Sequence, residues 1–206
     1  MTNEQQMVLE FMRTFGQTCP EGPCIPSLSV RILRAKLIFE EALELITHGL
    51  CVGIEIKSRP DGDWINIGEL EIEDIEFNQY GHGDLTLIAD GCSDLKVVTI
   101  GTEVACGIDG KEIFEEVHRS NMSKMWTLPE YKSANRLVDF SVTNVSSMNE
   151  DEMINSDRCF LVKNKDGKVI KSPSYSPANI KSIIERQQAR LVSIRETLAY
   201  SNWPAL

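Results

Sequence analysis

Apolar side chains recur every three or four residues in several stretches of the chain, which is the spacing that gathers them on one face of an α-helix. Residues 3–15 form the first stretch. A second stretch begins near Ser27 or Ser29, either of which can cap a helix, and runs to Gly49. Residues 84–106 return to the same period. These patterns predict three helices in the first half of the chain.

Two more helices are predicted in the second half. Residues 110–122 follow Asp109, and Glu112 three residues later completes the pattern of a capping box. Ser176 and Pro177 are typical of an N-cap followed by a first-turn proline, so a terminal helix should begin there. The apolar stripe of this last helix comprises Ile180, Ile183, Ile184, Leu191, Ile194 and Leu198.

Alternation of apolar and polar residues, which is typical of β-strands, interrupts the helical pattern twice. The alternating segments are residues 51–57, 64–67, 70–73, 137–142 and 159–162. A hairpin turn is expected at residues 164–167. We therefore predict a mainly α protein, a helical bundle that forms a single domain over residues 1–206. Small β-hairpin insertions are expected at about 51–80 and 128–165.

The composition is that of an acidic globular protein. The chain has 206 residues, of which 42% are hydrophobic, and its 21 Lys and Arg against 31 Asp and Glu give a net charge of −10. Such a surface repels a phosphate backbone, so we expect no nucleic-acid partner. A small phosphorylated substrate is still allowed, because bound divalent cations reverse the local field.

The sequence predicts neither secretion nor a membrane partner. The first residues lack the basic and apolar regions of a signal peptide, and the longest apolar runs are too short to cross a bilayer. Six cysteines show no C-x-x-C pair, which favours reduced thiols over a zinc site or a disulfide framework. We expect a cytoplasmic protein.

Acidic residues continue the apolar stripes of two predicted helices. The stripe of the second helix contains Leu33, Leu37, Glu40 and Glu44, and that of the third contains Leu87, Asp90, Asp94, Val97 and Gly101. If these faces pack together, four carboxylates point into one small volume, which is costly unless a cation joins them. A ligand set made only of oxygens favours Mg²⁺, with Mn²⁺ as a substitute.

Two other interpretations remain open. The acids can simply solvate a helix face, in which case the protein is a non-enzymatic helical interaction module. A di-iron bundle also gathers carboxylates from several helices, but it needs Glu-x-x-His pairs, which neither acidic segment has. Bound iron would favour this second alternative.

Three blocks of the chain resemble the MazG-like all-α NTP pyrophosphatases, a superfamily that includes phosphoribosyl-ATP pyrophosphohydrolases and dimeric dUTPases. The blocks are residues 11–45, 88–124 and 166–177. Within the superfamily the chain is similar to the phage and bacterial branch, and it resembles the MazZ proteins of phages that manage purine deoxynucleotide pools.

This resemblance implies cleavage of a nucleoside triphosphate between its α- and β-phosphates, which gives a monophosphate and pyrophosphate. It also implies two or more Mg²⁺ ions per site and assembly as a homodimer or homotetramer. The likeness to MazZ proteins favours a purine deoxynucleotide, with dGTP first, and the host cytoplasm if a phage encodes the chain.

The acidic motifs of the superfamily can be placed on this chain residue by residue. The first motif corresponds to Glu40, Glu41 and Glu44, and the aspartate of the second corresponds to Asp94. Many members have a glutamate three residues before that aspartate. This chain has Gly91 there, so we expect Asp90 to replace the missing ligand. Among the acids, Glu41 is the first candidate to accept a proton from water and Glu40 the second.

The resemblance also suggests contacts to the substrate. Lys124 and Lys171 match phosphate-contacting lysines, and Asn121 matches a sugar or phosphate contact. Arg34 is a further candidate for a phosphate contact, although for Arg31 and Arg34 we favour pairing with an acid.

Overall fold

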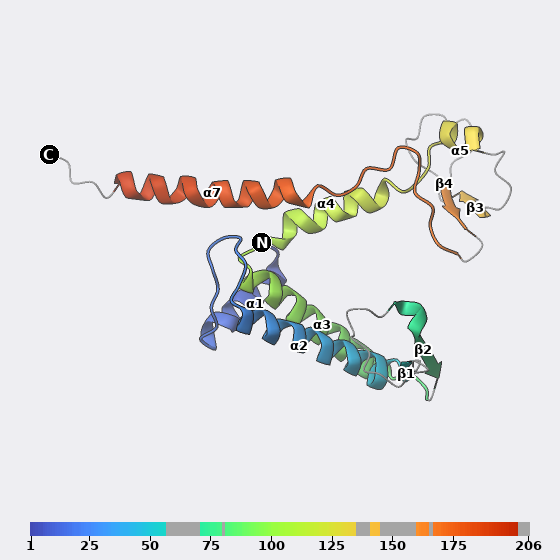
Figure 1. Ribbon diagram of the computed structural model, residues 1–206, viewed down its shortest axis with the longest axis horizontal. Coiled ribbons are helices and arrows are strands. Elements are labelled where there is room, and N and C mark those ends of the chain that lie inside the picture. Colours follow the sequence, from blue (N-terminus) through green and yellow to red (C-terminus); the bar gives the residue numbers. More distant parts are fainter. Residues whose placement is uncertain (57–70, 80, 135–140, 145–159, 165–166, 202–206) are drawn as a thin grey trace, which may run out of the picture. The chain divides into compact units, whose positions relative to one another are not determined.

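The computed structural model describes the chain except for residues 57–70, 80, 135–140, 145–159, 165–166 and 202–206. The chain divides into two compact units, Met1–Ile108 and Asp109–Leu206. It is mainly helical with small antiparallel sheets, which confirms the predicted fold class (Figure 1). That all 206 residues form one domain stays a prediction.

Three helices form most of the first unit, and Figure 1 shows them side by side. They are α1 (Asn3–Thr14), α2 (Leu28–Glu44) and α3 (Leu85–Ala105). The hydroxyl of Ser27 caps α2 by accepting a hydrogen bond from the backbone of Val30 at 3.4 Å. A π-helical turn, Leu45–Gly49, continues α2 to the predicted end. The three helices predicted in this half are therefore confirmed.

The core of the first unit lies between α1 and α3. It contains Val8 and Met12 of α1 together with Val104 and Ala105 of α3. Gln5, which is 1% exposed, donates from Nε2 to the carbonyl of Ile108 at 2.7 Å. This hydrogen bond satisfies a buried amide and fixes α1 against the end of α3.

A β-hairpin stands between α2 and α3 in the sequence. It pairs β1 (Val52–Ile56) with β2 (Ile75–Gln79) in antiparallel register. The strand expected at 51–57 is confirmed, whereas the strand expected at 70–73 is wrong. Ile72–Asp74 forms a 3₁₀ turn instead, because the Asp74 side chain accepts from the backbone of Glu71 at 3.0 Å. Residues 64–67 lie outside the described residues.

The second unit contains α4 (Gly110–Met122), α5 (Leu128–Ala134) and α7 (Ile180–Ser201). Asp109 caps α4 as predicted, but Glu112 does not complete a capping box. The backbone of Asp109 instead donates to Oε1 of Gln187 at 3.0 Å and accepts from its Nε2 at 2.9 Å. Glu112 accepts from Arg190 at 2.6 Å. Both contacts fasten α7 to the first turn of α4.

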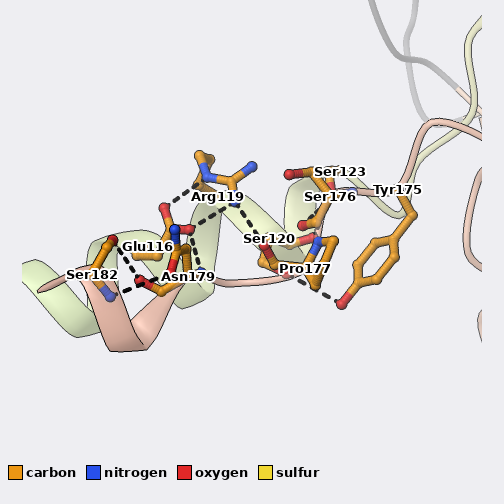
Figure 2. A network of polar contacts seen from close by, with 9 residues as sticks. All are labelled: Glu116, Arg119, Ser120, Ser123, Tyr175, Ser176, Pro177, Asn179 and Ser182. Atoms are coloured by element: carbon orange, nitrogen blue, oxygen red, sulfur yellow. Dashed lines mark hydrogen bonds and ion pairs between the residues drawn. The ribbon is translucent and has the colours of Figure 1, made fainter. Parts of the chain in front are cut away.

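The terminal helix begins later than predicted. Asn179, not Ser176, caps α7, since its side chain accepts from the backbone of Ser182 at 3.3 Å. The backbone N–H of Ser176 donates to Oγ of Ser123 at 3.0 Å, which ties this segment to α4 (Figure 2). The predicted apolar stripe is buried at Ile183 but 56% exposed at Ile194.

A second small sheet pairs β3 (Ser141–Asn144) with β4 (Phe160–Lys163). Its strand β4 matches the strand expected at 159–162, while most of the strand expected at 137–142 lies outside the described residues. A hydrogen bond from Asn164 N to Lys168 O of 2.9 Å joins the residues on either side of the turn expected at 164–167, whose residues 165–166 lie outside the described residues. The core beside this sheet comprises Trp126, Leu128, Phe160 and Val162.

Among the described helices, none combines the length and the apolar character that crossing a membrane requires.

Candidate active site

The antiparallel pairing of α2 with α3 depends on two glycines of α3. A Cβ atom on Gly101 would lie 2.8 Å from Nη1 of Arg34, and one on Gly91 would lie 3.1 Å from Cβ of Leu45. Both distances are shorter than ordinary van der Waals contact, so Gly91 permits a close approach of the helices and Gly101 leaves room for the Arg34 guanidinium. Arg34 thus faces Gly101 at one end of the pair, and Leu45 faces Gly91 at the other.

This register brings Glu41 of α2 opposite Asp94 of α3. Glu41 follows Arg34 by seven residues, and Asp94 precedes Gly101 by seven residues. Seven residues span nearly two helical turns, so each acid lies on the same face as the contact that defines the register. Glu41 is partly buried and Asp94 is exposed. The two predicted acidic motifs therefore meet across the helix pair.

Four other carboxylates act on Glu41. Partial burial raises the pKa of Glu41 above its ordinary value, and the negative charges of its neighbours raise it further. In decreasing order of effect these neighbours are Asp94, Glu44, Glu40 and Asp90. Because the Coulombic interaction weakens with distance, all five acids predicted as metal ligands share one neighbourhood.

The buried face of α2 differs from the predicted face by one position, whereas α3 buries Gly101 of its predicted stripe but not Val97. On α2, Leu33 of the predicted stripe is 47% exposed, whereas Arg34 is 8% exposed. On α3, Val97 is 43% exposed and Val98 is 8% exposed. One residue corresponds to a rotation of about 100° around a helix. As a result, Glu41 is the glutamate of the first motif that faces α3.

Gly91 occupies the position where many members of the superfamily carry a glutamate. Its neighbour across the helix pair is Leu45, whose Cα lies 3.2 Å from the position of a Cβ atom at residue 91. A glutamate would therefore require the helices to move apart. Asp90, one residue earlier, is exposed and contributes to the field at Glu41. Its role as a replacement ligand stays a prediction.

The five acids offer only carboxylate oxygens, which suit hard ions such as Mg²⁺ and Mn²⁺. Within the described part of the chain, no group of three or more His, Cys, Asp or Glu side chains is arranged to hold a metal ion. Carboxylates of like charge approach one another closely only when a cation offsets their repulsion. The chemistry of the acids suits a divalent ion, but their arrangement among the described residues does not form a ligand set, so the metal site stays a prediction.

The predicted substrate-binding lysines lie close together in the second unit. Nζ of Lys124 donates to Oδ1 of Asn121 at 2.8 Å, and the backbone of Ser172 donates to the carbonyl of Lys124 at 3.2 Å. The second bond places Lys171, the preceding residue, beside Lys124. Neither lysine forms an ion pair with a carboxylate of the described residues. This is a concentration of positive charge in a chain whose net charge is −10.

Hydroxyl side chains that the sequence reading missed fasten residues 171–177 to α4. Oγ of Ser172 donates to the carbonyl of Ser123 at 2.8 Å. Figure 2 shows the hydrogen bond that Oγ of Ser120 donates to the Tyr175 hydroxyl at 3.3 Å. Serines are common on any surface. The sequence signals these residues only by their position within two of the blocks that resemble the superfamily.

Arg34 lies inside the first unit. Its Nη2 donates to Oε1 of Gln17 at 2.6 Å and contacts Sδ of Met12 at 3.6 Å, and its buried Nε has no hydrogen-bond partner. The acidic partner that we favoured is therefore not found among the described residues. Since this guanidinium is enclosed, we do not include Arg34 among the substrate contacts proposed below.

The crowding around Glu41 predicts that Glu41→Gln stabilises the protein when divalent ions are removed by chelation. The substitution removes a charge that four neighbouring carboxylates repel, so at pH 7 we expect Tm to rise by roughly 1–3 °C. The gain should shrink as the pH falls towards 4.5, the ordinary glutamate value, because the raised pKa leaves native Glu41 increasingly protonated.

Thermal unfolding followed by circular dichroism at several pH values measures this effect. Glu10→Gln, at an exposed position of α1, is the matched control and should leave Tm nearly unchanged. A Tm lowered by Glu41→Gln at pH 7 would contradict the crowding.

A comparison with known protein families matches the segment of the chain that contains these acids. The family model for phosphoribosyl-ATP pyrophosphohydrolase matches residues 8–121, which is more than half of the 206-residue chain. The matched span contains α2 and α3 with all five acids, as well as Asn121. No curated protein matches the chain. The chain belongs to the phosphoribosyl-ATP pyrophosphohydrolase family, and so to a family of pyrophosphohydrolases.

Proposed function

We propose that this chain is a Mg²⁺-dependent nucleoside triphosphate pyrophosphohydrolase. It cleaves a (d)NTP, with dGTP preferred, between the α- and β-phosphates and releases a (d)NMP and pyrophosphate. The observation that carries this proposal is the meeting of Glu41 and Asp94 across α2 and α3, with three more acids in their neighbourhood. The family match over the same helices supports the reaction type.

In this proposal each acid has a defined task. Glu40, Glu44, Asp90 and Asp94 ligate two or more ions, with Glu41 shared between ligation and proton transfer. A bound Mg²⁺ or Mn²⁺ neutralises phosphate oxygens and activates a water for in-line attack. Glu41 is positioned to take the proton of that water, because it is the partly buried acid at the centre of the group. Glu40 is the second candidate for this role.

In this proposal Lys124 and Lys171 contact the phosphates of the substrate. Both ammonium groups lack a carboxylate partner among the described residues, so neither must break an ion pair to bind an anion. Asn121 is assigned a sugar or phosphate contact, and its hydrogen bond orients the Lys124 side chain. The preference for dGTP rests on the resemblance to MazZ proteins, as does a location in the host cytoplasm.

We further propose that the chain assembles as a homodimer or homotetramer. The resemblance implies this, and one face of α2 supports it. Leu28, Ile32 and Phe39 recur at helical spacing there and are 62%, 48% and 53% exposed. A row of large apolar side chains on a helix is covered at little cost by the same row of a second copy.

A substrate panel tests the reaction. The purified chain is incubated with Mg²⁺ and each of the four dNTPs, the four NTPs and phosphoribosyl-ATP, and the products are resolved by chromatography. We expect monophosphate and pyrophosphate, fastest from dGTP. Diphosphate and phosphate would contradict cleavage between the α- and β-phosphates. Turnover of phosphoribosyl-ATP alone would contradict the substrate class but not the pyrophosphohydrolase reaction.

In the same assay, Asp94→Asn should lower kcat/KM by at least about a hundredfold, because metal-ion catalysis supplies several kcal/mol of transition-state stabilisation. Glu10→Gln is the control and should retain full activity. Equal activity of Asp94→Asn and the parent would favour the non-enzymatic interaction module, and turnover that requires tightly held iron would favour the di-iron alternative.

Light scattering at micromolar concentration tests the assembly. We expect the mass of a dimer or tetramer, and a shift towards the monomer in Ile32→Asp, because a charge on the exposed stripe of α2 would be buried at the contact between copies. Arg13→Asp, at an exposed position of α1, is the control. A monomeric parent protein would contradict the proposal.

A further inference from the structure

Residues 171–177 form a short segment that is fixed along the end of α4. The Ser172 hydroxyl donates to the carbonyl of Ser123 at 2.8 Å. In Figure 2, Oγ of Ser123 accepts from the backbone of Ser176 at 3.0 Å. Ser172 and Ser123 are 4% and 8% exposed. Buried hydrogen bonds of this kind restrain a backbone that has no secondary structure of its own.

Within this segment, Tyr175 is restrained at its backbone and at its hydroxyl. The backbone N–H of Tyr175 donates to the carbonyl of Ser172 at 3.0 Å. At the other end, the buried Ser120 donates to the Tyr175 hydroxyl at 3.3 Å. Figure 2 shows the ring extending from the segment towards Ser120 on α4. A ring held in this way offers a fixed face to its neighbours.

The ammonium group of Lys171 lies over the face of the Tyr175 ring. Its Nζ lies 4.4 Å from the centroid of the Tyr175 ring, within the range of a cation–π interaction. The hydrogen bond from Ser120 lowers the pKa of the Tyr175 hydroxyl, and the charges of Lys171, Lys124 and Arg119 lower it further. Both proposed phosphate-contacting lysines therefore act on one hydroxyl, which places their side chains in the same locality.

We propose that Tyr175 is a positioning residue that holds the Lys171 ammonium beside Lys124, so that the two cations together bind the pyrophosphate part of the substrate. This inference rests on the proposed function. A lysine ammonium ends a flexible four-carbon stem, and ordering that stem costs binding free energy. The aromatic face of Tyr175 partly orders the Lys171 side chain before the substrate binds. Unlike a carboxylate, the ring does not compete with phosphate for the ammonium group.

Titration calorimetry of the full-length chain with inorganic pyrophosphate and Mg²⁺ tests the inference. Tyr175→Leu should raise Kd about two- to fivefold, the range of a cation–π interaction at an exposed site. Tyr175→Phe keeps the aromatic face but loses the hydrogen bond from Ser120, so its loss should be clearly smaller than that of Tyr175→Leu. The KM for the nucleotide should rise by the same factor in Tyr175→Leu while kcat is retained, since the residue touches no reacting atom.

A double-mutant cycle separates positioning of Lys171 from a general structural role. Once Lys171→Met has removed the ammonium, Tyr175→Leu should weaken pyrophosphate binding no further. Lys181→Met, at an exposed position of α7, is the control and should bind as the parent does. If Tyr175→Leu unfolds, Ser120→Ala takes its place and should give a smaller loss that also disappears in the Lys171→Met background.

Three results would overturn the inference. An equal loss from Tyr175→Leu with and without Lys171 would show that Tyr175 acts independently of the ammonium, and a loss in Tyr175→Phe as large as in Tyr175→Leu would show that the ring face is irrelevant. Both leave the proposed function standing. Unchanged pyrophosphate binding in Lys171→Met would instead contradict the proposed phosphate contact of Lys171. The inference about Tyr175 would then fail as well.

Discussion

The close antiparallel approach of α2 and α3 determines where the acids of this chain lie. Gly91 permits the approach, because a Cβ atom there would lie 3.2 Å from Cα of Leu45, and Gly101 leaves room for the Arg34 guanidinium between the helices. The register that follows places Glu41 opposite Asp94. Two motifs that are some fifty residues apart in the sequence thereby share one electrostatic neighbourhood, and the proposed metal chemistry depends on that single geometric fact.

The second unit contributes charge of the opposite sign, and it does so by a different construction. Here no helix pair sets the geometry. Short hydrogen bonds from serines join residues 171–177 to the end of α4 and bring Lys171 beside Lys124. The proposed function assigns a separate task to each group, with divalent ions assigned to the acids and phosphate assigned to the lysines. The chain builds the first on long helices and the second on a fastened loop.

The helices were predictable from the sequence because periodicity and capping are local properties. The face that a helix buries was less predictable from the sequence. Arg34 lies in the interior with a neutral partner, Gln17, and hydropathy alone assigns an arginine to the surface. The stripe was therefore placed through Leu33, one position away. Similarly, the start of α7 was misplaced because Ser176 bonds to Ser123, a tertiary contact that competes with capping. The acidic motifs are visible in the sequence, and their role as metal ligands stays a prediction.

The most direct test of the account is the binding of Mn²⁺, followed by electron paramagnetic resonance, to the parent chain and to Asp94→Asn. The account predicts at least one bound ion per chain, Mg²⁺ competition for the same site, and an affinity at least about tenfold weaker in the variant, as expected for a lost ligand. Glu10→Gln should bind Mn²⁺ as the parent does. Equal affinity in Asp94→Asn would contradict the claim that acids of α2 and α3 share a divalent ion.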